Sequence, residues 1–233
     1  MTMAGRTALT LGILAVLAGA GSPGRAQSAA EPLGRVPWSH MHTLLQKTIF
    51  KVDVLNLDIC FDAATARRFA AIAARSPLEG AAADSIVRAA LGGSRAFARV
   101  EFARDVSLDQ FLEGVGEDLR NAVATGVLAD SVYRVISAGL PHWYAFAAER
   151  GIRKGDLLLY DLAPDSVRTV FLGREGRTLL DQTERGRARR NSPMASWLAP
   201  GSGFRSGLLR SLQRQGAQGV GAAVAARCQV PAR

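Results

Sequence analysis

The sequence predicts an α+β fold, with one antiparallel sheet that carries helices on one of its faces. Two observations lead to this prediction. Segments with helical periodicity and segments that alternate with period two are grouped along the chain, unlike the regular strand–helix alternation of parallel-sheet proteins. In addition, three short alternating segments follow one another with only short turns between them, as in an antiparallel meander. The 233-residue length fits one domain once an N-terminal targeting segment is subtracted.

The N-terminus has the pattern of a secretory signal. In residues 1–26, Arg6 precedes the apolar run 7–21, and small residues follow. The run is shorter than the roughly 20 residues that span a bilayer. No cysteine precedes Cys60, so the thiol that a lipid anchor would need is missing. We therefore expect a soluble periplasmic or secreted protein that begins, after cleavage, with a disordered lead-in at 27–36.

The first half of the expected domain alternates two strands with two helices, at 48–61 (strand), 63–75 (helix), 82–91 (helix) and 95–103 (strand). β-Branched and aromatic residues mark the first strand. Asp62 can cap the first helix, and the Ser76–Pro77 pair ends it. In the second strand, Phe97, Arg99 and Glu101 alternate with smaller apolar side chains, as in a half-buried strand.

The next helix has the clearest signals in the chain. Ser107 and Gln110 form a capping box, and apolar residues such as Phe111 and Val115 follow at helical spacing. The segment 130–150 is helical as well. Pro141 predicts that it splits into two helices.

The C-terminal part combines the meander with two helices. The expected elements are strands at 155–163, 167–173 and 176–182, a basic loop at 185–190, helices at 194–198 and 205–215, and a Gly/Ala-rich tail at 216–233. No repeat of 20–50 residues is visible.

Four segments in this order resemble the chalcone isomerase-like family. They are KTIFKVDVLNLDICF, VEFARDVSLDQFLEGVGEDL, RGIRKGDLLLYDLAP with VRTVFLGREGRTLLD, and SPMASWLAPGSGFRSGLLRSL. The resemblance covers most of a domain at 37–215. It implies an open-faced β-sandwich with a lipophilic cleft between sheet and helices. It also implies either an isomerase that closes an aryl ketone ring on a phenol, or a fatty-acid-binding relative.

The positions that the resemblance assigns to isomerase chemistry carry other residues. The arginine position falls on Leu45 or Gln46, the strand hydroxyl on Asp53, the helix tyrosine on Phe111 and the asparagine on Asp118. A carboxylate would repel the phenolate or enolate that such a site must stabilise. The sequence therefore favours a non-catalytic member.

Seven residues are candidates for contact with a lipophilic ligand: Lys51, Asp53, Leu55, Leu57, Arg99, Phe111 and Val115. Leu55 and Leu57 lie on the apolar face of the expected strand, and Phe111 and Val115 lie on the apolar face of the expected helix. Strand alternation and helical spacing direct these two faces toward each other. Lys51 or Arg99 would hold a charged head group. Lys51 and Asp53 share a strand face, so they are either a functional pair or solvated charges at a strand end.

Other patterns have weaker support. His40 and His42 have the spacing of metal ligands, but no acid or cysteine cluster accompanies them, and we expect no metal and no cofactor. Export permits a disulfide between Cys60 and Cys228, although two free thiols fit the sequence equally. The Arg185–Arg190 loop is either a solvated face or a contact for anionic lipid. Nucleic acid is not expected, because no aromatic residues are interleaved with this loop.

Three hypotheses follow. The first is an exported, non-catalytic protein that binds a lipophilic small molecule such as a fatty acid. The second is an isomerase or lyase with altered acid–base chemistry centred on Asp53 and Lys51. The third is an envelope protein whose basic face contacts anionic lipid, in keeping with a formal net charge of +9. The sequence does not indicate an oligomeric state.

Overall fold

A computed structural model of the chain describes residues 39–47, 52–215 and 228. The chain divides into two units, Met1–Glu31 and Pro32–Arg233, and all of the described residues belong to the second. The expected signal segment, the lead-in and Lys51 lie outside the described residues. So does the expected tail except for Cys228. No helix in the described part is long and apolar enough to cross a membrane.

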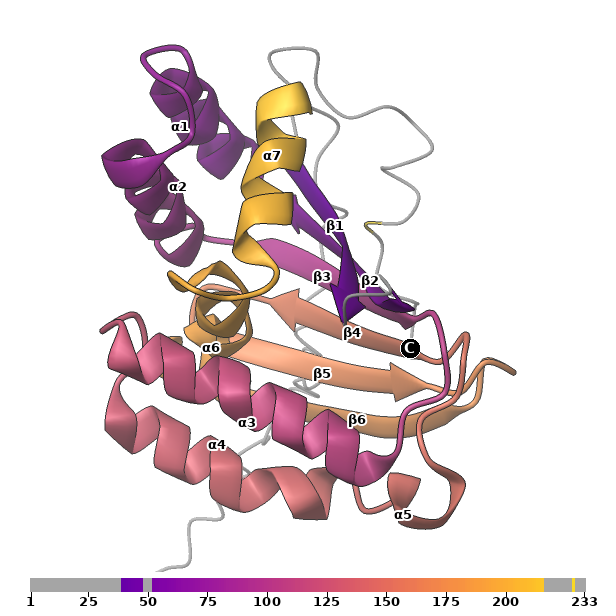
Figure 1. The fold of residues 1–233 in the computed structure, drawn as a ribbon. Coiled ribbons are helices and arrows are strands. Elements are labelled where there is room, and N and C mark those ends of the chain that lie inside the picture. The colour runs from indigo at the N-terminus through magenta and orange to yellow at the C-terminus, as the bar shows by residue number, and fades with distance from the viewer. Residues whose placement is uncertain (1–38, 48–51, 216–227, 229–233) are drawn as a thin grey trace, which may run out of the picture. The chain divides into compact units, whose positions relative to one another are not determined.

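The described part forms one six-stranded antiparallel sheet whose strands are neighbours in the order of the sequence. The strands are β1 (Ser39–Lys47), β2 (Val52–Phe61), β3 (Ala96–Phe102), β4 (Leu157–Leu162), β5 (Ser166–Leu172) and β6 (Thr178–Arg185). The predicted α+β class and the predicted meander β4–β5–β6 are confirmed. The sheet is open, with β1 and β6 at its edges (Figure 1).

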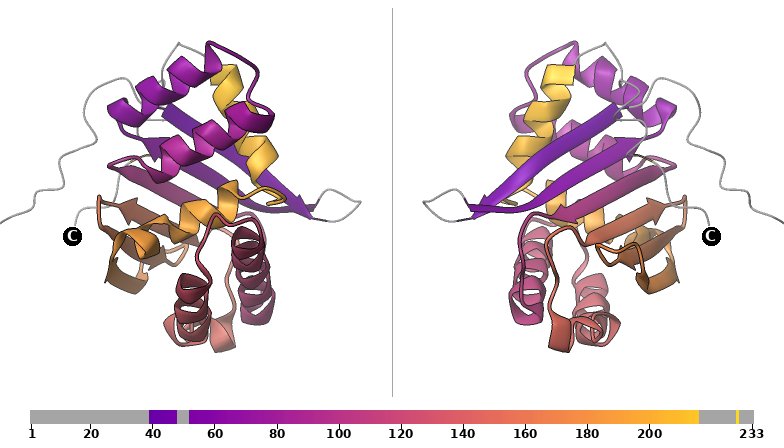
Figure 2. Two further views of the ribbon diagram at one scale, coloured as in Figure 1. Left: turned by 90° about the vertical axis from the view of Figure 1, so that its left-hand side faces the viewer. Right: turned by 90° about the vertical axis from the view of Figure 1, so that its right-hand side faces the viewer.

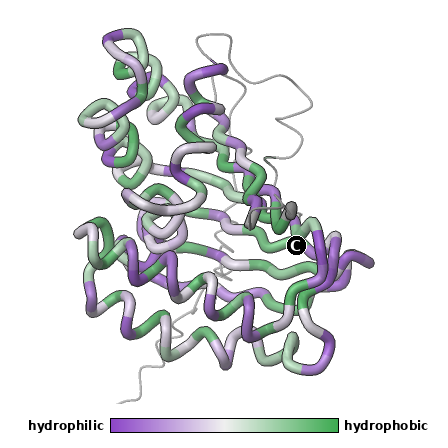
Figure 3. Tube along the Cα trace, viewed as in Figure 1, coloured by the Kyte–Doolittle hydropathy of each residue, from purple (hydrophilic) through white to green (hydrophobic). Residues whose placement is uncertain are grey.

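Seven helices accompany the sheet in the described residues. They are α1 (Ala63–Ala73), α2 (Gly80–Leu91), α3 (Leu108–Ala124), α4 (Asp130–Trp143), α5 (Ala147–Arg150), α6 (Arg187–Leu198) and α7 (Arg205–Gln215). In Figure 2, α1, α2, α6 and α7 lie to one side of the strands. Figure 3 shows hydrophobic and hydrophilic residues alternating along α3 and α4, as expected of helices that pack through one face.

Strand alternation gives the sheet two different faces. The inner face, which packs against the helices, carries one register row of Leu57, Val100, Leu158 and Phe171, all buried. The neighbouring row of the outer face carries Asp58, Arg99, Leu159 and Val170. A second, smaller apolar cluster lies on that outer face and includes both cysteines.

Local signals explain the helix starts that the sequence predicts. Asp62 accepts a hydrogen bond from the backbone N–H of Thr65 at the start of α1. At the start of α3, the Ser107 hydroxyl accepts from the Gln110 backbone N–H, and the Gln110 side chain accepts from the Ser107 backbone N–H. The capping box is therefore confirmed, and it fixes where the amphipathic face of α3 begins.

The edge of β1 is covered by α7. The backbone N–H of His40 donates to Gln215 Oε1 (3.0 Å), and that of His42 donates to Ser211 Oγ (2.8 Å). These two groups point away from β2, so α7 side chains satisfy backbone donors that an edge strand otherwise leaves to solvent or to another chain.

The first strand pair differs from the sequence-based expectation of one strand at 48–61. Pairing begins at Val52 in β2, and residues 48–51 lie outside the described residues. The preceding strand, β1, was not predicted, because SHMHTLLQK lacks a regular apolar alternation. A bulge opposite Leu45 and Gln46 interrupts the β1–β2 register.

Two helix boundaries also differ from expectation. The predicted split of 130–150 into two helices is confirmed, but Pro141 lies within α4 and does not end it. The break comes after Trp143 instead. The second difference concerns α6, which begins at Arg187 rather than at 194. Most of the expected basic loop at 185–190 is therefore helical.

A buried carboxylate orders the approach to β4. Asp156 is fully buried and accepts two hydrogen bonds from Arg150 (2.9 and 3.1 Å) and others from the backbone N–H groups of Arg153 and Arg174. Burial alone would raise the pKa of Asp156, but these bonds outweigh it and lower the pKa. All its oxygens serve the loop structure, so Asp156 has a structural role.

Candidate ligand-binding cavity

A cavity of about 700 Å³ lies between the inner face and the helices α3, α4 and α6. This volume is within the usual range for small-molecule sites. The sheet contributes Val100, Phe102, Leu158 and Tyr160, among others, and α3 contributes residues from Gln110 to Asn121.

One part of the cavity wall is aromatic and aliphatic. Phe111 of α3 meets Tyr144 edge-on (ring centroids 4.8 Å apart) and lies 6.0 Å from Phe102 of β3. Val115, one helical turn after Phe111, lies in the same wall. Val54 and Leu55 also line the cavity, because the β2 bulge turns two successive side chains toward it.

The structure therefore brings together three of the sequence-predicted ligand residues, Leu55, Phe111 and Val115, in one cavity wall. Leu57 is fully buried in the core beneath the helices and is not part of the lining. The side chain of Asp53, like the whole of Lys51, is outside the described residues.

Arg99 is separated from the other predicted ligand residues. It alternates with Ala98 and Val100, which belong to the inner face, so its side chain lies on the outer face, where it pairs with Glu101 (2.9 Å). Arg99 therefore cannot hold the head group of a ligand in this cavity. Arg104 is the only arginine or lysine in the described lining, and it has no ion-pair partner among the described residues.

A polar row crosses the otherwise apolar inner face. Tyr160 of β4 is opposite Thr169 of β5, which is opposite Gln182 of β6, and all three line the cavity. We call these three residues the polar row. Thr169 is 5% exposed, and neither its hydroxyl nor the Gln182 amide has a side-chain hydrogen bond within the described part of the chain.

Two tyrosine hydroxyls meet at this end of the cavity. Burial raises the pKa of Tyr144 well above its usual value, and its hydrogen bond to Tyr160 raises it further. Burial raises the pKa of Tyr160 to about 12 despite the same bond. Both phenols therefore stay neutral at ordinary pH.

A charged pair lies next to the polar row. Glu184 of β6 lines the cavity and forms an ion pair with Arg189 of α6. The Arg189 guanidinium also lies over the Trp143 ring, 5.2 Å from its centroid. The negative charge of Glu184 is thus already compensated by protein.

The predicted basic loop is not a uniformly exposed surface. Arg185 and Arg187 are exposed, whereas Arg189 is half-buried and Arg190 is 1% exposed. Arg190 donates to the carbonyl oxygens of Ala163 (3.1 Å) and Leu91 (3.3 Å), and burial lowers its pKa. The expectation of an exposed loop over the whole of 185–190 is therefore wrong.

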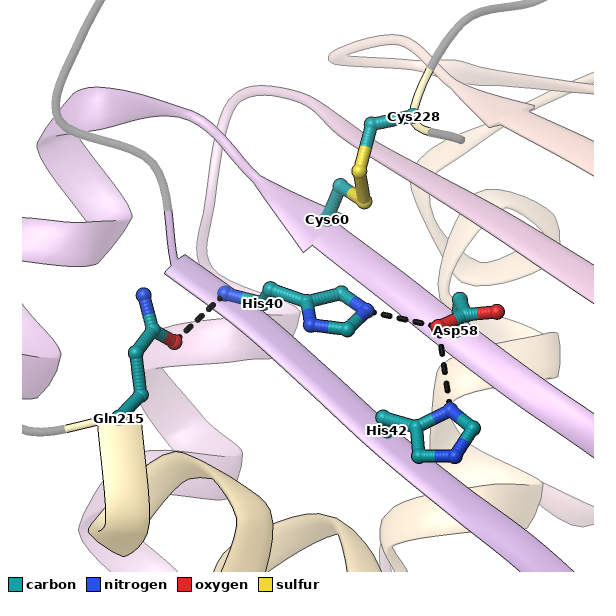
Figure 4. The surroundings of a disulfide bond; sticks show 6 residues. All are labelled: His40, His42, Asp58, Cys60, Gln215 and Cys228. Atoms are coloured by element: carbon teal, nitrogen blue, oxygen red, sulfur yellow. Dashed lines mark hydrogen bonds and ion pairs between the residues drawn. A yellow bond between two sulfur atoms is a disulfide. The ribbon is translucent and has the colours of Figure 1, made fainter. Parts of the chain in front are cut away.

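The outer face holds a second polar cluster, drawn in Figure 4. Asp58 Oδ1 is 2.8 Å from His40 Nε2 and 3.1 Å from His42 Nδ1, and the aspartate side chain is 2% exposed. Burial alone would raise the pKa of Asp58, but the bonds from His40 and His42 hold it well below its usual range. An ionised carboxylate only accepts, so both rings donate through these nitrogens. Among the described residues, no group of His, Cys, Asp and Glu is arranged to hold a metal ion.

The disulfide between Cys60 and Cys228 lies beside this cluster on the outer face (Figure 4). It resolves the alternative that the sequence left open. Phe97, Leu159 and Val170 pack around it in the smaller apolar cluster. Asp58 accepts from both histidines, which makes the cluster a structural element of the outer face.

Sequence reasoning did not find the polar row or the Asp58 cluster. Tyr160, Thr169 and Gln182 come from three strands and meet only through the register of the meander. His40 and His42 were considered as metal ligands, and Asp58 was not among the candidate site residues. Asp58 and Cys60 are two residues apart on one strand, so strand alternation places both on the same face. If the disulfide buries that face, the carboxylate needs a nearby hydrogen-bond partner, and this was the signal that the sequence offered.

No protein family model matches the chain, and no curated protein matches it in sequence.

Proposed function

We propose that this protein is an exported carrier of a lipophilic small molecule, such as a fatty acid, held in the cavity between the inner face and α3. The observation that carries the proposal is the cavity itself. It has a volume of about 700 Å³, and Leu55, Phe111 and Val115 contribute apolar surface to its wall. The chalcone isomerase-like assignment stays part of this proposal.

A cavity of this size can take a small molecule. Protein interiors are close-packed, and side chains that line a void lose dispersion contacts on one side. Phe111 is half-buried although it contacts Phe102 and Tyr144. An acyl chain in the cavity would complete the packing of this ring and remove its remaining apolar surface from water.

The head group of an acid would find a cation at Arg104. This residue follows β3 and lies in the cavity lining without an ion-pair partner among the described residues. Glu113 and Glu117 of α3 also lie in the lining, but they are exposed, so water and salt screen their repulsion. A carboxylate at Arg104 would gain a charge-assisted hydrogen bond.

Two observations support export. The disulfide Cys60–Cys228 is of the kind that persists in oxidising compartments. The N-terminal residues 1–26 have the composition of a signal segment, although they lie outside the described residues.

The other two hypotheses have less support. The enzyme hypothesis depends on Asp53 and Lys51, whose side chains are outside the described residues, and it stays a prediction. The anionic-lipid hypothesis rests on a basic face, and it stays a prediction. Within residues 185–190, Arg189 and Arg190 are engaged inside the domain, so Arg185 and Arg187 are the exposed arginines of this segment.

The test is a titration of oleic acid and methyl oleate, each displacing a fluorescent fatty acid. Phe111→Ala should weaken oleic acid binding by about 1 to 3 kcal/mol, because it removes apolar contact area. Arg104→Gln should weaken the acid more than the ester. Arg99→Gln is the matched control on the outer face and should leave both affinities unchanged. If the folded wild type and all variants bind equally, or the wild type does not bind, the proposal is wrong.

A further inference from the structure

The polar row is an unusual wall for a cavity that holds only hydrocarbon. A methylene group offers nothing to the Thr169 hydroxyl or the Gln182 amide, and neither has a partner among the described residues. Burying such groups against a saturated chain leaves them without the hydrogen bonds that they make to water. A ligand that carries its own polar group at this depth would avoid that loss.

The row offers both donors and acceptors. Tyr160 lines the cavity, and its neutral hydroxyl can donate and accept. The Thr169 hydroxyl and the Gln182 amide can each donate and accept. A hydroxyl or keto oxygen on a ligand can therefore take the place of a water molecule here and reproduce its hydrogen bonds.

The charges around the row favour an uncharged ligand group. Glu184, one step further along β6 on the same face, is already paired with Arg189. The two phenols stay neutral because burial raises the pKa of each. A second carboxylate placed here would be desolvated without a free cation, and an ammonium would find no unpaired anion.

The row and Arg104 lie in the lining of the same cavity, so one ligand can contact both. Tyr160 is opposite Ala98 in the sheet register, and Arg104 follows β3 further along the same chain. At about 3.4 Å per residue, the chain from Ala98 to Arg104 covers at most about 20 Å. A long-chain fatty acid whose carboxylate is at Arg104 can therefore reach the row with its chain.

We propose that the cavity selects an acyl chain that bears an uncharged oxygen, a hydroxyl or a keto group, and that the polar row of Tyr160, Thr169 and Gln182 binds this oxygen. The inference rests on the proposed carrier function and narrows its ligand class. It predicts a preference within a pair of acids that differ only at one position along the chain.

Ricinoleic acid and oleic acid are such a pair, because they differ by one mid-chain hydroxyl. The folded wild-type protein should bind ricinoleic acid about tenfold or more tightly, as expected for one well-made buried hydrogen bond. Thr169→Val keeps the side-chain shape and removes the hydroxyl. It should reduce the preference to about threefold or less and leave oleic acid binding unchanged or slightly tighter.

Two controls separate the possible failures. Thr183→Val makes the same change on the opposite face of β6 and should keep the full preference. Phe111→Ala should weaken both acids to the same extent. Equal binding of the two acids by the wild type, or a preference that Thr169→Val leaves intact, overturns this inference and leaves the carrier function standing. If neither acid binds, the proposed function fails and this inference with it.

Discussion

The two faces of the sheet treat their buried polar groups in opposite ways. On the outer face, the Asp58 carboxylate accepts from both His40 and His42. On the inner face, Thr169 is nearly as buried, yet neither it nor the neighbouring Gln182 has a side-chain partner among the described residues. Both sets lie at the centre of a strand register, so position along the strand does not explain the difference.

This contrast offers a way to assign roles. A buried polar group with all its partners in the protein stabilises the fold, and its removal leaves those partners unsatisfied. A polar side chain that lines a cavity and has no partner among the described residues can bind a ligand instead. By this criterion the Asp58 cluster is structural and the polar row is the candidate ligand site. The following experiments test the criterion.

The largest effect is expected from the disulfide on the outer face. The bond closes a loop with a sequence separation of 168 residues, so the chain-entropy relation predicts a stabilisation of about 5 kcal/mol. Replacing Cys60 and Cys228 by alanine should lower the free energy of unfolding by several kcal/mol in urea. Oleic acid affinity should be unchanged while the variant is folded. Two reactive thiols in the denatured wild-type protein would contradict the bond.

A smaller loss is expected from Asp58→Asn. The substitution weakens two charge-assisted hydrogen bonds and should lower the free energy of unfolding at pH 7 by about 2 kcal/mol. Because the folded-state pKa of Asp58 is depressed, its contribution is present above the unfolded value of about 4 and is lost as pH falls below it. Urea titrations at several pH values should therefore show that the difference in unfolding free energy between the wild type and Asp58→Asn becomes smaller in acid. If this difference in unfolding free energy stays constant down to pH 3, the carboxylate charge is not what stabilises the cluster.

The smallest effect is expected on the inner face. Thr169→Val removes a hydroxyl that has no described partner, so the free energy of unfolding should change by less than about 0.5 kcal/mol or rise slightly. The same urea titration, run beside Asp58→Asn, gives the comparison. A loss as large as that of Asp58→Asn would break the criterion, because it would show that Thr169 is bonded within the fold.

Local signals predicted much of the fold. The capping box at Ser107 and Gln110, the Asp62 cap and the period-two meander each act within a few residues, so the sequence contains the whole signal. The strand β1 has no such signal. It pairs with β2, and α7, which lies more than 150 residues further along the chain, bonds to its free edge.

The candidate site was predictable only where periodicity was sufficient. Phe111 and Val115 share a face of α3 because of the helical repeat, and Leu55 follows from strand alternation. Arg99 was misplaced because its face depends on the register between strands rather than on charge. Arg190 was expected in solvent, but carbonyl oxygens of two distant segments receive its guanidinium. The positions of Arg99 and Arg190 both depend on segments that are distant in the sequence, so the residues around each arginine do not predict them.

The position of Cys228 determines when the disulfide can form during synthesis. Cys60 is in the second strand, whereas its partner follows every other strand and helix of the described part. The ribosome therefore completes all of these elements before the second sulfur exists. A chain that ends before residue 228 cannot make the bond. The disulfide therefore forms only after every other described strand and helix has been synthesised.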